Sequence, residues 1–152
     1  MKVIAVIPAR YKSTRFEGKP LVNLCGKPMI WWVHHQLCQV KGLSEIYVAT
    51  DDERIRKVCS DYGIKYVMTS DSHPTHLDRL AEFAENIESD FYININGDEP
   101  LMMPEYVERL LPTSDLNPVD FYFANAMTKI KKTVEVADIS RIKVVTDNLG
   151  YA

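Results

Sequence analysis

The fold is set by residues 3–20, which read Val3-Ile4-Ala5-Val6-Ile7 and then Pro8-Ala9-Arg10-Tyr11-Lys12-Ser13-Thr14-Arg15-Phe16-Glu17-Gly18-Lys19-Pro20. The first five residues are apolar and rich in β-branched side chains, which predicts a short buried strand. The segment that follows is punctuated by glycine and proline and carries arginine and lysine. A buried strand that leads into such a loop is typical of the phosphate sites of α/β proteins.

Positive charge is concentrated in this loop. Between Met1 and Pro20 there are five basic residues and one acidic residue, whereas the whole chain of 152 residues carries a net charge of −3. Arginine can hold phosphate oxygens in a bidentate fork, and lysine supplies a compact point charge. Gly18 would let backbone N–H groups approach an anion. A solvated basic turn is the alternative, but the position after a buried strand favours a polyanionic ligand, most simply a nucleoside triphosphate.

The overall composition indicates one globular domain over residues 1–152, with enough apolar residues for a core. We expect no nucleic-acid partner, because the basic loop is too local to follow a duplex backbone. Cys25, Cys38 and Cys59 have no metal-binding spacing and are odd in number, so we expect reduced thiols in the cytoplasm. The apolar run 3–7 is far too short for a signal peptide or a membrane span, so no membrane association is expected.

Strand-like and helix-like segments alternate along the chain. The predicted strands are 3–7, 45–50, 65–68, 91–95, 121–127 and 142–147, and the predicted helices are 28–40, 53–62, 76–86 and 104–111. This alternation predicts an α/β fold with a Rossmann-like, doubly wound, mostly parallel sheet. Segment 91–95 is almost wholly apolar, which favours a central strand covered on both faces. In such sheets, ligands bind beyond the carboxyl ends of the strands.

A second unusual loop, Asn96-Gly97-Asp98-Glu99-Pro100, follows segment 91–95. These residue types are common in β-turns, so a plain turn is the alternative interpretation. However, Mg²⁺ binds through one or two carboxylates together with substrate phosphates, which makes Asp98 a candidate metal ligand. Because this loop and loop 8–20 both follow predicted strands, we expect them to share one site. Neither loop has the glycine pattern of a P-loop or of a dinucleotide-binding turn.

Four motifs occur in order along nearly the whole chain: Pro8-Ala9-Arg10-Tyr11-x-Ser13-x-Arg15-x-x-Gly18-Lys19-Pro20-Leu21, Gly26-Lys27-Pro28-Met29-Ile30, Val48-Ala49-Thr50-Asp51-Asp52 and Gly97-Asp98-Glu99-Pro100. In this combination the chain resembles the 3-deoxy-manno-octulosonate (Kdo) cytidylyltransferases. The resemblance implies a Rossmann-like nucleotidyltransferase domain that uses CTP, Mg²⁺ and an acidic sugar and releases pyrophosphate. It also implies a homodimer and, for a Kdo product, a place in lipopolysaccharide or capsule synthesis.

The resemblance further implies roles for particular residues. Arg10, Arg15 and Lys19 would grip the triphosphate, and Asp98 would be the metal ligand. Arg79 matches a family arginine that approaches the nucleotide and the sugar. The expected catalytic residues are Arg10, Lys19 and Asp98, and the expected nucleotide-binding residues are Pro8, Ala9, Arg10, Ser13, Arg15, Lys19, Arg79 and Asn96.

Three features depart from the family pattern. Thr75-His76-Leu77-Asp78-Arg79 stands where the family usually has Ser-Gly-Thr-(Glu/Asp)-Arg, which motivates a different acid sugar as substrate, an 8-amino Kdo analogue or a nonulosonate. Asn96 stands where the family usually has glutamine. Family members also continue well beyond Ala152, so the chain resembles the N-terminal portion of a longer enzyme, apparently truncated at the C-terminus. A non-catalytic fragment that binds CTP is therefore a further alternative.

Overall fold

The computed structural model describes residues 1–12, 16–113 and 123–148. The chain divides into two compact units, Met1–Leu111 and Pro112–Ala152, which are described separately below. The expectation of a single cytidylyltransferase domain over residues 1–152 stays a prediction.

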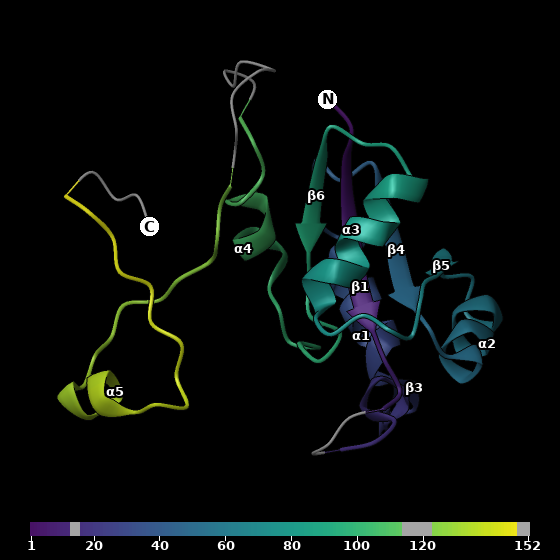
Figure 1. Cartoon of the computed structure of the whole chain (residues 1–152), viewed down its shortest axis with the longest axis horizontal. Helices are drawn as coiled ribbons and strands as arrows, with labels where there is room; N and C mark the ends of the chain where they lie inside the picture. Colours follow the sequence, from purple (N-terminus) through teal and green to yellow (C-terminus); the bar gives the residue numbers. More distant parts are fainter. Residues whose placement is uncertain (13–15, 114–122, 149–152) are drawn as a thin grey trace. The chain divides into compact units, whose positions relative to one another are not determined.

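A four-stranded sheet forms the centre of the first unit (Figure 1). Its strands are β1 (Val3–Ala9), β4 (Glu45–Thr50), β5 (Tyr66–Met68) and β6 (Phe91–Asn94), in the order β5-β4-β1-β6. All three pairings between neighbouring strands are parallel, which confirms the predicted parallel sheet.

The prediction that segment 91–95 is a central strand is not confirmed by the described residues, among which β6 pairs with β1 alone. The apolar pattern has another cause, because Ile93 packs into the core on one face and Tyr92 into the core on the other. Apolar residues on both sides of a strand report that its two faces are covered, and they carry no information about its two hydrogen-bonding edges.

Helices cover both faces of the sheet, as a doubly wound fold requires. Figure 1 shows α3 (His76–Asn86) across one face and α1 (Met29–Leu37) across the other. Phe83 of α3 is fully buried against Ile4 and Val6 of β1. The opposite face packs against α1, α2 (Glu53–Asp61) and α4 (Pro104–Glu108), through the buried residues Ile30, Val33, Leu37, Ile55, Cys59 and Val107.

Nearby side chains cap the N-termini of α2 and α3, the two helices that begin at the carboxyl edge of the sheet. At α2, the Asp52 side chain accepts a hydrogen bond from the N–H of Arg54. At α3, Thr75 and Asp78 form a reciprocal capping box. Side-chain caps satisfy N–H groups that a helix leaves unpaired at its first turn. Three short elements lie between β1 and α1: a 3₁₀ turn η1 (Lys19–Leu21) and an antiparallel pair, β2 (Asn23–Leu24) and β3 (Lys27–Pro28).

The second unit contains one helix among its described residues, α5 (Thr133–Ala137). The predicted strands 121–127 and 142–147 are not confirmed, because residues 123–127 and 142–147 form no strand and residues 121 and 122 lie outside the described residues. A strand needs a neighbour for its backbone hydrogen bonds, and no described segment pairs with these residues. Apolar side chains there, such as Phe123, Ile142 and Val145, are largely exposed. In the described parts of both units, no helix combines the length and the apolar character needed to cross a membrane.

Glu45, at the start of β4, is an acidic residue with two close hydrogen-bond donors. Its carboxylate accepts hydrogen bonds from Lys65 Nζ at 2.8 Å and from the Tyr47 hydroxyl at 2.6 Å. The bond from Lys65, and then the bond from Tyr47, lowers the pKa of Glu45 from 4.5 to about 2. A carboxyl group with a lowered pKa stabilises the fold above its unfolded-state pKa, and this contribution is lost as the pH falls through the folded-state value.

We therefore expect Glu45→Gln to lower the free energy of unfolding at pH 7, with a difference from wild type that narrows as the pH falls from 4.5 towards about 2. Urea denaturation at a series of pH values measures this difference. Glu85→Gln, at an exposed position on α3, is the matched control and should follow wild type throughout. A Glu45→Gln difference that stays constant over this pH range would contradict the prediction.

Candidate active site

The loops that follow β1 and β6 meet at the carboxyl edge of the sheet. Lys19 Nζ lies 2.6 Å from Oδ2 of Asp98, and both side chains are partly exposed. The backbones also approach closely, since a Cβ added at Gly97 would lie 3.3 Å from the carbonyl oxygen of Pro8. The two loops therefore lie together, as the sequence predicts.

This meeting point is where the strand order reverses. From β1 the chain moves to β4 and β5 on one side, and β6 then adds to the other side of β1. Open α/β sheets bind ligands in the crevice beyond such a switch point, because the connections after the two strands diverge there. The Lys19–Asp98 pair thus spans the position at which this fold is built to hold a ligand.

Gly18 sets the direction in which Lys19 leaves the first loop. Its N–H donates to the carbonyl of Tyr11 at 2.9 Å, and its φ of +68° lies in the left-handed region. A Cβ at this position would lie 2.9 Å from the Tyr11 ring. Glycine is needed on both grounds, because other residues rarely adopt this φ and would also clash with the ring. Lys19 then starts the η1 turn, with Pro20 as its second residue.

The same tyrosine fastens the loop to α2. The guanidinium carbon of Arg54 lies 3.2 Å from the centre of the Tyr11 ring, a cation–π contact. Arg54 also holds both carboxylate oxygens of Asp52, at 2.9 Å through Nε and 2.6 Å through Nη2. These hydrogen bonds from Arg54 lower the pKa of Asp52. Sequence reasoning missed Tyr11 and Arg54 as a pair, since no local spacing connects them.

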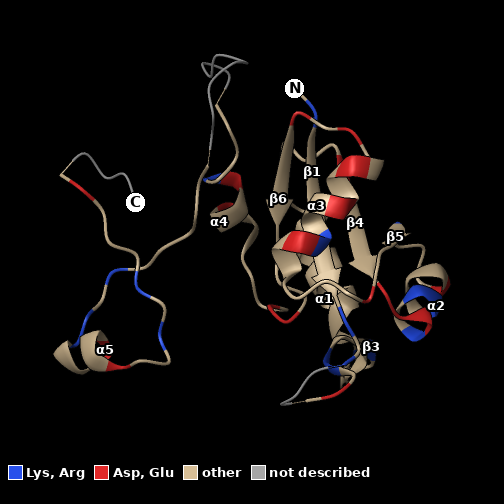
Figure 2. Cartoon of the chain, viewed as in Figure 1, with Lys and Arg blue, Asp and Glu red and all other residues tan. Residues whose placement is uncertain are grey.

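The other described residues predicted for these loops follow the ends of β1 and β6. Pro8 and Ala9 end β1, and Arg10 is the exposed first residue of the loop. Asn96 is exposed after β6, and its side-chain amide donates to Glu99 Oε1 at 3.1 Å. Figure 2 shows basic residues along the segment that runs from β1 to β3. Ser13 and Arg15 lie outside the described residues, and the triphosphate-binding roles of all these residues stay predictions.

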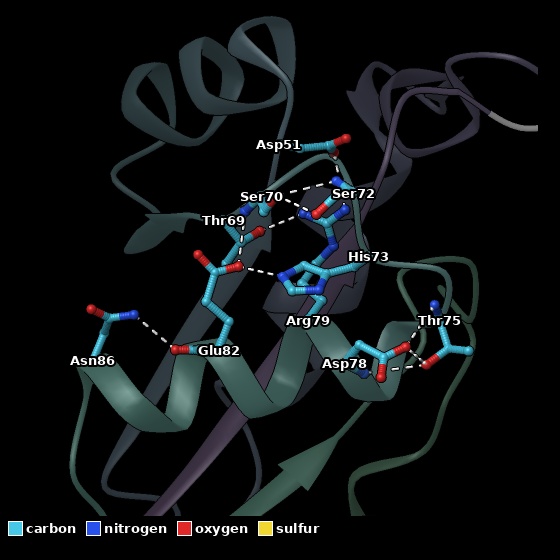
Figure 3. Close-up of polar contacts among 10 residues, drawn as sticks. All are labelled: Asp51, Thr69, Ser70, Ser72, His73, Thr75, Asp78, Arg79, Glu82 and Asn86. Atoms are coloured by element: carbon cyan, nitrogen blue, oxygen red, sulfur yellow. Dashed lines mark hydrogen bonds and ion pairs between the residues drawn. The ribbon is translucent and has the colours of Figure 1, made fainter.

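Arg79 lies in a different setting from the one expected for a residue that contacts a ligand. It is 4% exposed on α3, and its Nη1 donates to the Thr69 hydroxyl (Figure 3). Its Nη2 lies 3.3 Å from Oδ1 of Asp51. Asp51 directly follows β4 and Thr69 directly follows β5, so Arg79 ties α3 to the ends of two strands. Its predicted approach to nucleotide and sugar stays a prediction.

Sequence reasoning did not identify Asp51 and Thr69 as the two partners of Arg79. The available signal was their place, since each polar residue comes directly after a strand in a predicted parallel sheet. Oδ1 of Asp51 is buried and makes no aligned hydrogen bond with the described residues, so its contact with Arg79 is an ion pair. Oδ1 of Asp51 is therefore compensated by the charge of Arg79 and not by a hydrogen bond.

Asp98 suits a hard cation that is shared with a substrate. Among the described residues, no group of three or more His, Cys, Asp or Glu side chains is placed to hold a metal ion. Mg²⁺ does not require such a group, because it keeps several waters and binds through one or two carboxylates plus phosphates. The carboxylate of Asp98 is 46% exposed and lies beside Lys19, which fits a shared site of this kind.

Comparisons with known proteins show which family the chain resembles. A sequence model of the family described as Cytidylyltransferase matches residues 4–152. A 3-deoxy-manno-octulosonate cytidylyltransferase of Geotalea uraniireducens is 43% identical over 100% of this chain and 60% of its own length. An 8-amino-3,8-dideoxy-manno-octulosonate cytidylyltransferase of Shewanella sp. (strain W3-18-1) is 41% identical over 100% of this chain and 63% of its own length.

A solved structure is similar as well. It is described as CMP:2-keto-3-deoxy-manno-octonic acid synthetase complexed with CTP, and it is 46% identical with a TM-score of 0.71. The match covers 72% of this chain and 46% of that one. The present chain spans about 60% of the length of the curated relatives that it matches. With a family model that covers almost every residue, this chain belongs to the cytidylyltransferase family.

Proposed function

We propose that this chain carries the nucleotide site of an enzyme that transfers CMP from CTP to an acidic sugar, Kdo or a close analogue, and releases pyrophosphate. The observation that carries the proposal is the Lys19–Asp98 pair, which joins a basic loop to an acidic loop at the switch point of the sheet. The names of the relatives support CTP and a Kdo-like sugar as substrates.

The reaction needs no protein nucleophile. A hydroxyl oxygen of the sugar attacks the α-phosphorus of CTP, the new P–O bond forms, and the bond to the oxygen that bridges to the β-phosphorus breaks. Pyrophosphate leaves with that bridging oxygen, and the proton of the attacking hydroxyl is released to water. Lys19 and Arg10 would hold the triphosphate in line and neutralise its charge. Mg²⁺, when bound at Asp98, would supply further charge neutralisation on the phosphates.

Four further properties are part of the proposal. Mg²⁺ dependence is supported by the exposed carboxylate of Asp98. A cytoplasmic location is supported by Cys25, Cys38 and Cys59, which are all free thiols. An intermediate of lipopolysaccharide synthesis as product is proposed on the family resemblance. A homodimer is proposed on the family resemblance. No nucleic-acid partner is proposed, since the basic residues are confined to one loop.

The 8-amino analogue of Kdo is a second candidate for the sugar. The Shewanella relative named for that sugar is 41% identical, close to the 43% of the relative named for Kdo. His76 and Leu77, where the family usually has Gly-Thr, are exposed at the start of α3. These larger side chains give the start of α3 a different surface from that of the usual family sequence, which supports a sugar other than Kdo.

Pyrophosphate release from CTP and Mg²⁺ tests the proposed function, with Kdo, with the 8-amino analogue and without sugar. Sugar-dependent release supports the proposal, and the faster of the two sugars identifies the substrate. If neither sugar gives release while calorimetry detects CTP binding, transfer to these sugars is contradicted and the chain is a CTP-binding fragment.

A further inference from the structure

Tyr11 connects the start of the basic loop, residues 8–20, to its end. Its carbonyl oxygen accepts the N–H of Gly18 at 2.9 Å, and its ring lies so close to Gly18 that a Cβ there would approach the ring to 2.9 Å. The ring also packs against the buried core. Because Lys19 follows Gly18 and its Nζ lies 2.6 Å from Oδ2 of Asp98, the position of this lysine depends on the Tyr11 ring.

Arg54, in the first turn of α2, lies over one face of that ring. Its guanidinium carbon is 3.2 Å from the ring centre. The guanidinium is held in this orientation, since two of its nitrogens donate to the two carboxylate oxygens of Asp52. Asp52 in turn caps α2 by accepting the backbone N–H of Arg54. The Tyr11 ring is therefore contacted both by the core and by a cation that is fixed to the start of a helix.

The end of the basic loop also lies beside α2. The η1 turn, which begins at Lys19, contacts this helix. The hydrogen bond to Asp52 is the main cause that raises the pKa of Arg54, and Tyr11 and the charge of Glu17 add to this rise. Glu17 directly precedes Gly18. Arg54 thus holds the start of the loop through Tyr11 and attracts its end through Glu17.

The charge of Arg54 is balanced by its own helix cap. Nη2 of Arg54 lies 2.6 Å from Oδ2 of Asp52, whereas the basic loop carries four basic residues and one acidic residue. Like charges repel one another, so the net charge of the loop favours an open arrangement when no anion is bound. A cation that already has a carboxylate partner can hold the loop through an aromatic ring while it adds little to this repulsion.

We propose that Arg54 is a positioning residue, which acts through Tyr11 to hold Gly18 and Lys19 in the arrangement that receives the triphosphate of CTP. This inference rests on the proposed function, which assigns the triphosphate to the basic loop. A loop that is already ordered loses less conformational entropy when its ligand binds, so the contribution of Arg54 appears as affinity for CTP. Arg54 needs no contact with the reacting atoms.

The first test compares Arg54→Ala with wild type and with Lys57→Ala, which removes one positive charge from the same helix. Lys57 is 72% exposed and pairs with Asp61. The Arg54 side chain is 55% exposed, so its loss should leave the fold intact. In the ligand-free protein, amide hydrogen exchange at Gly18 should rise about fivefold in Arg54→Ala, the size expected for one cation–π contact at a partly exposed site. Lys57→Ala should exchange like wild type.

Calorimetric titration with CTP supplies the second measurement. The Kd for CTP should rise about fivefold in Arg54→Ala, and Lys57→Ala should keep the wild-type value. In steady-state kinetics the KM for CTP should rise by the same factor, while kcat and the KM for the sugar change less than about twofold. Unchanged exchange at Gly18, or an unchanged Kd for CTP, would overturn the positioning role.

A double-mutant cycle with Tyr11→Leu separates action through the ring from direct attraction of the triphosphate by charge. If Arg54 acts through Tyr11, adding Arg54→Ala to Tyr11→Leu should raise the Kd for CTP no further than Tyr11→Leu does alone. Additive effects would overturn the proposal, because Arg54 would then attract CTP directly. Urea denaturation checks that Tyr11→Leu is folded, and the first two measurements do not depend on it. If wild type binds no CTP, the proposed function has failed, and exchange at Gly18 still decides whether Arg54 orders the loop.

Discussion

Replacing Asp98 by asparagine is expected to lower kcat about a thousandfold while the fold is retained. Asparagine has nearly the shape of aspartate but lacks the charge that pairs with Lys19 and would hold a cation beside the triphosphate. The Asp98 side chain is 46% exposed, and a partly exposed ion pair contributes about 1 kcal/mol or less to stability. We therefore expect Asp98→Asn to lose most of its kcat while its free energy of unfolding stays close to that of wild type.

Initial rates of pyrophosphate release at saturating CTP and sugar measure the effect of Asp98→Asn, together with urea denaturation as a check on folding. Glu105→Gln, at an exposed position on α4, removes one acidic charge elsewhere and should keep wild-type turnover. Wild-type turnover in Asp98→Asn would refute both the metal-binding role and the assignment of the site to this loop.

The second large effect is expected at Arg79, and it concerns stability. Arg79→Met keeps the length of the buried aliphatic stem but removes the guanidinium, which leaves the carboxylate of Asp51 unpaired. The two side chains are 5% and 15% exposed, and removing one partner of a buried ion pair costs about 3 kcal/mol or more. Thr69 would also lose the group that donates to its hydroxyl.

Urea denaturation of Arg79→Met, Asp51→Asn and the double variant forms a double-mutant cycle that isolates this interaction. The double variant should be more stable than Arg79→Met alone, because it no longer buries an unpaired charge. Arg109→Met, at an exposed position, is the control and should lie close to wild type. If adding Asp51→Asn restores no stability to Arg79→Met, the ion pair is not the source of the loss.

Much of the first unit follows from local sequence patterns. The predicted helix 76–86 and the predicted strand 45–50 have the bounds of α3 and β4. Each is defined by short-range features, namely the Thr75–Asp78 capping box of α3 and the alternating β-branched residues of β4. The meeting of Lys19 with Asp98 follows from a general rule of parallel sheets, in which strand ends share one edge.

Features that depend on distant partners could not be predicted in this way. The position of β6 in the strand order depends on which strands lie beside it, and the pattern of residues within a strand does not record this. The partners of Arg79 and the Tyr11 ring that contacts Arg54 come from other segments of the chain, so no spacing in the sequence reveals them. In the second unit, apolar residues such as Ile142 suggest a strand, but a strand forms only where another strand pairs with it.

Asp51 and Asp52 are adjacent in the chain, yet they hold different elements in place. Asp51 pairs with Arg79 of α3, while Asp52 binds Arg54, which lies on Tyr11 of the basic loop. Neighbouring Cα atoms are about 3.8 Å apart across a rigid peptide plane, so these two supports cannot move independently. A displacement of Arg79 would therefore be transmitted through a single peptide unit to Arg54 and to the Tyr11 ring beneath it.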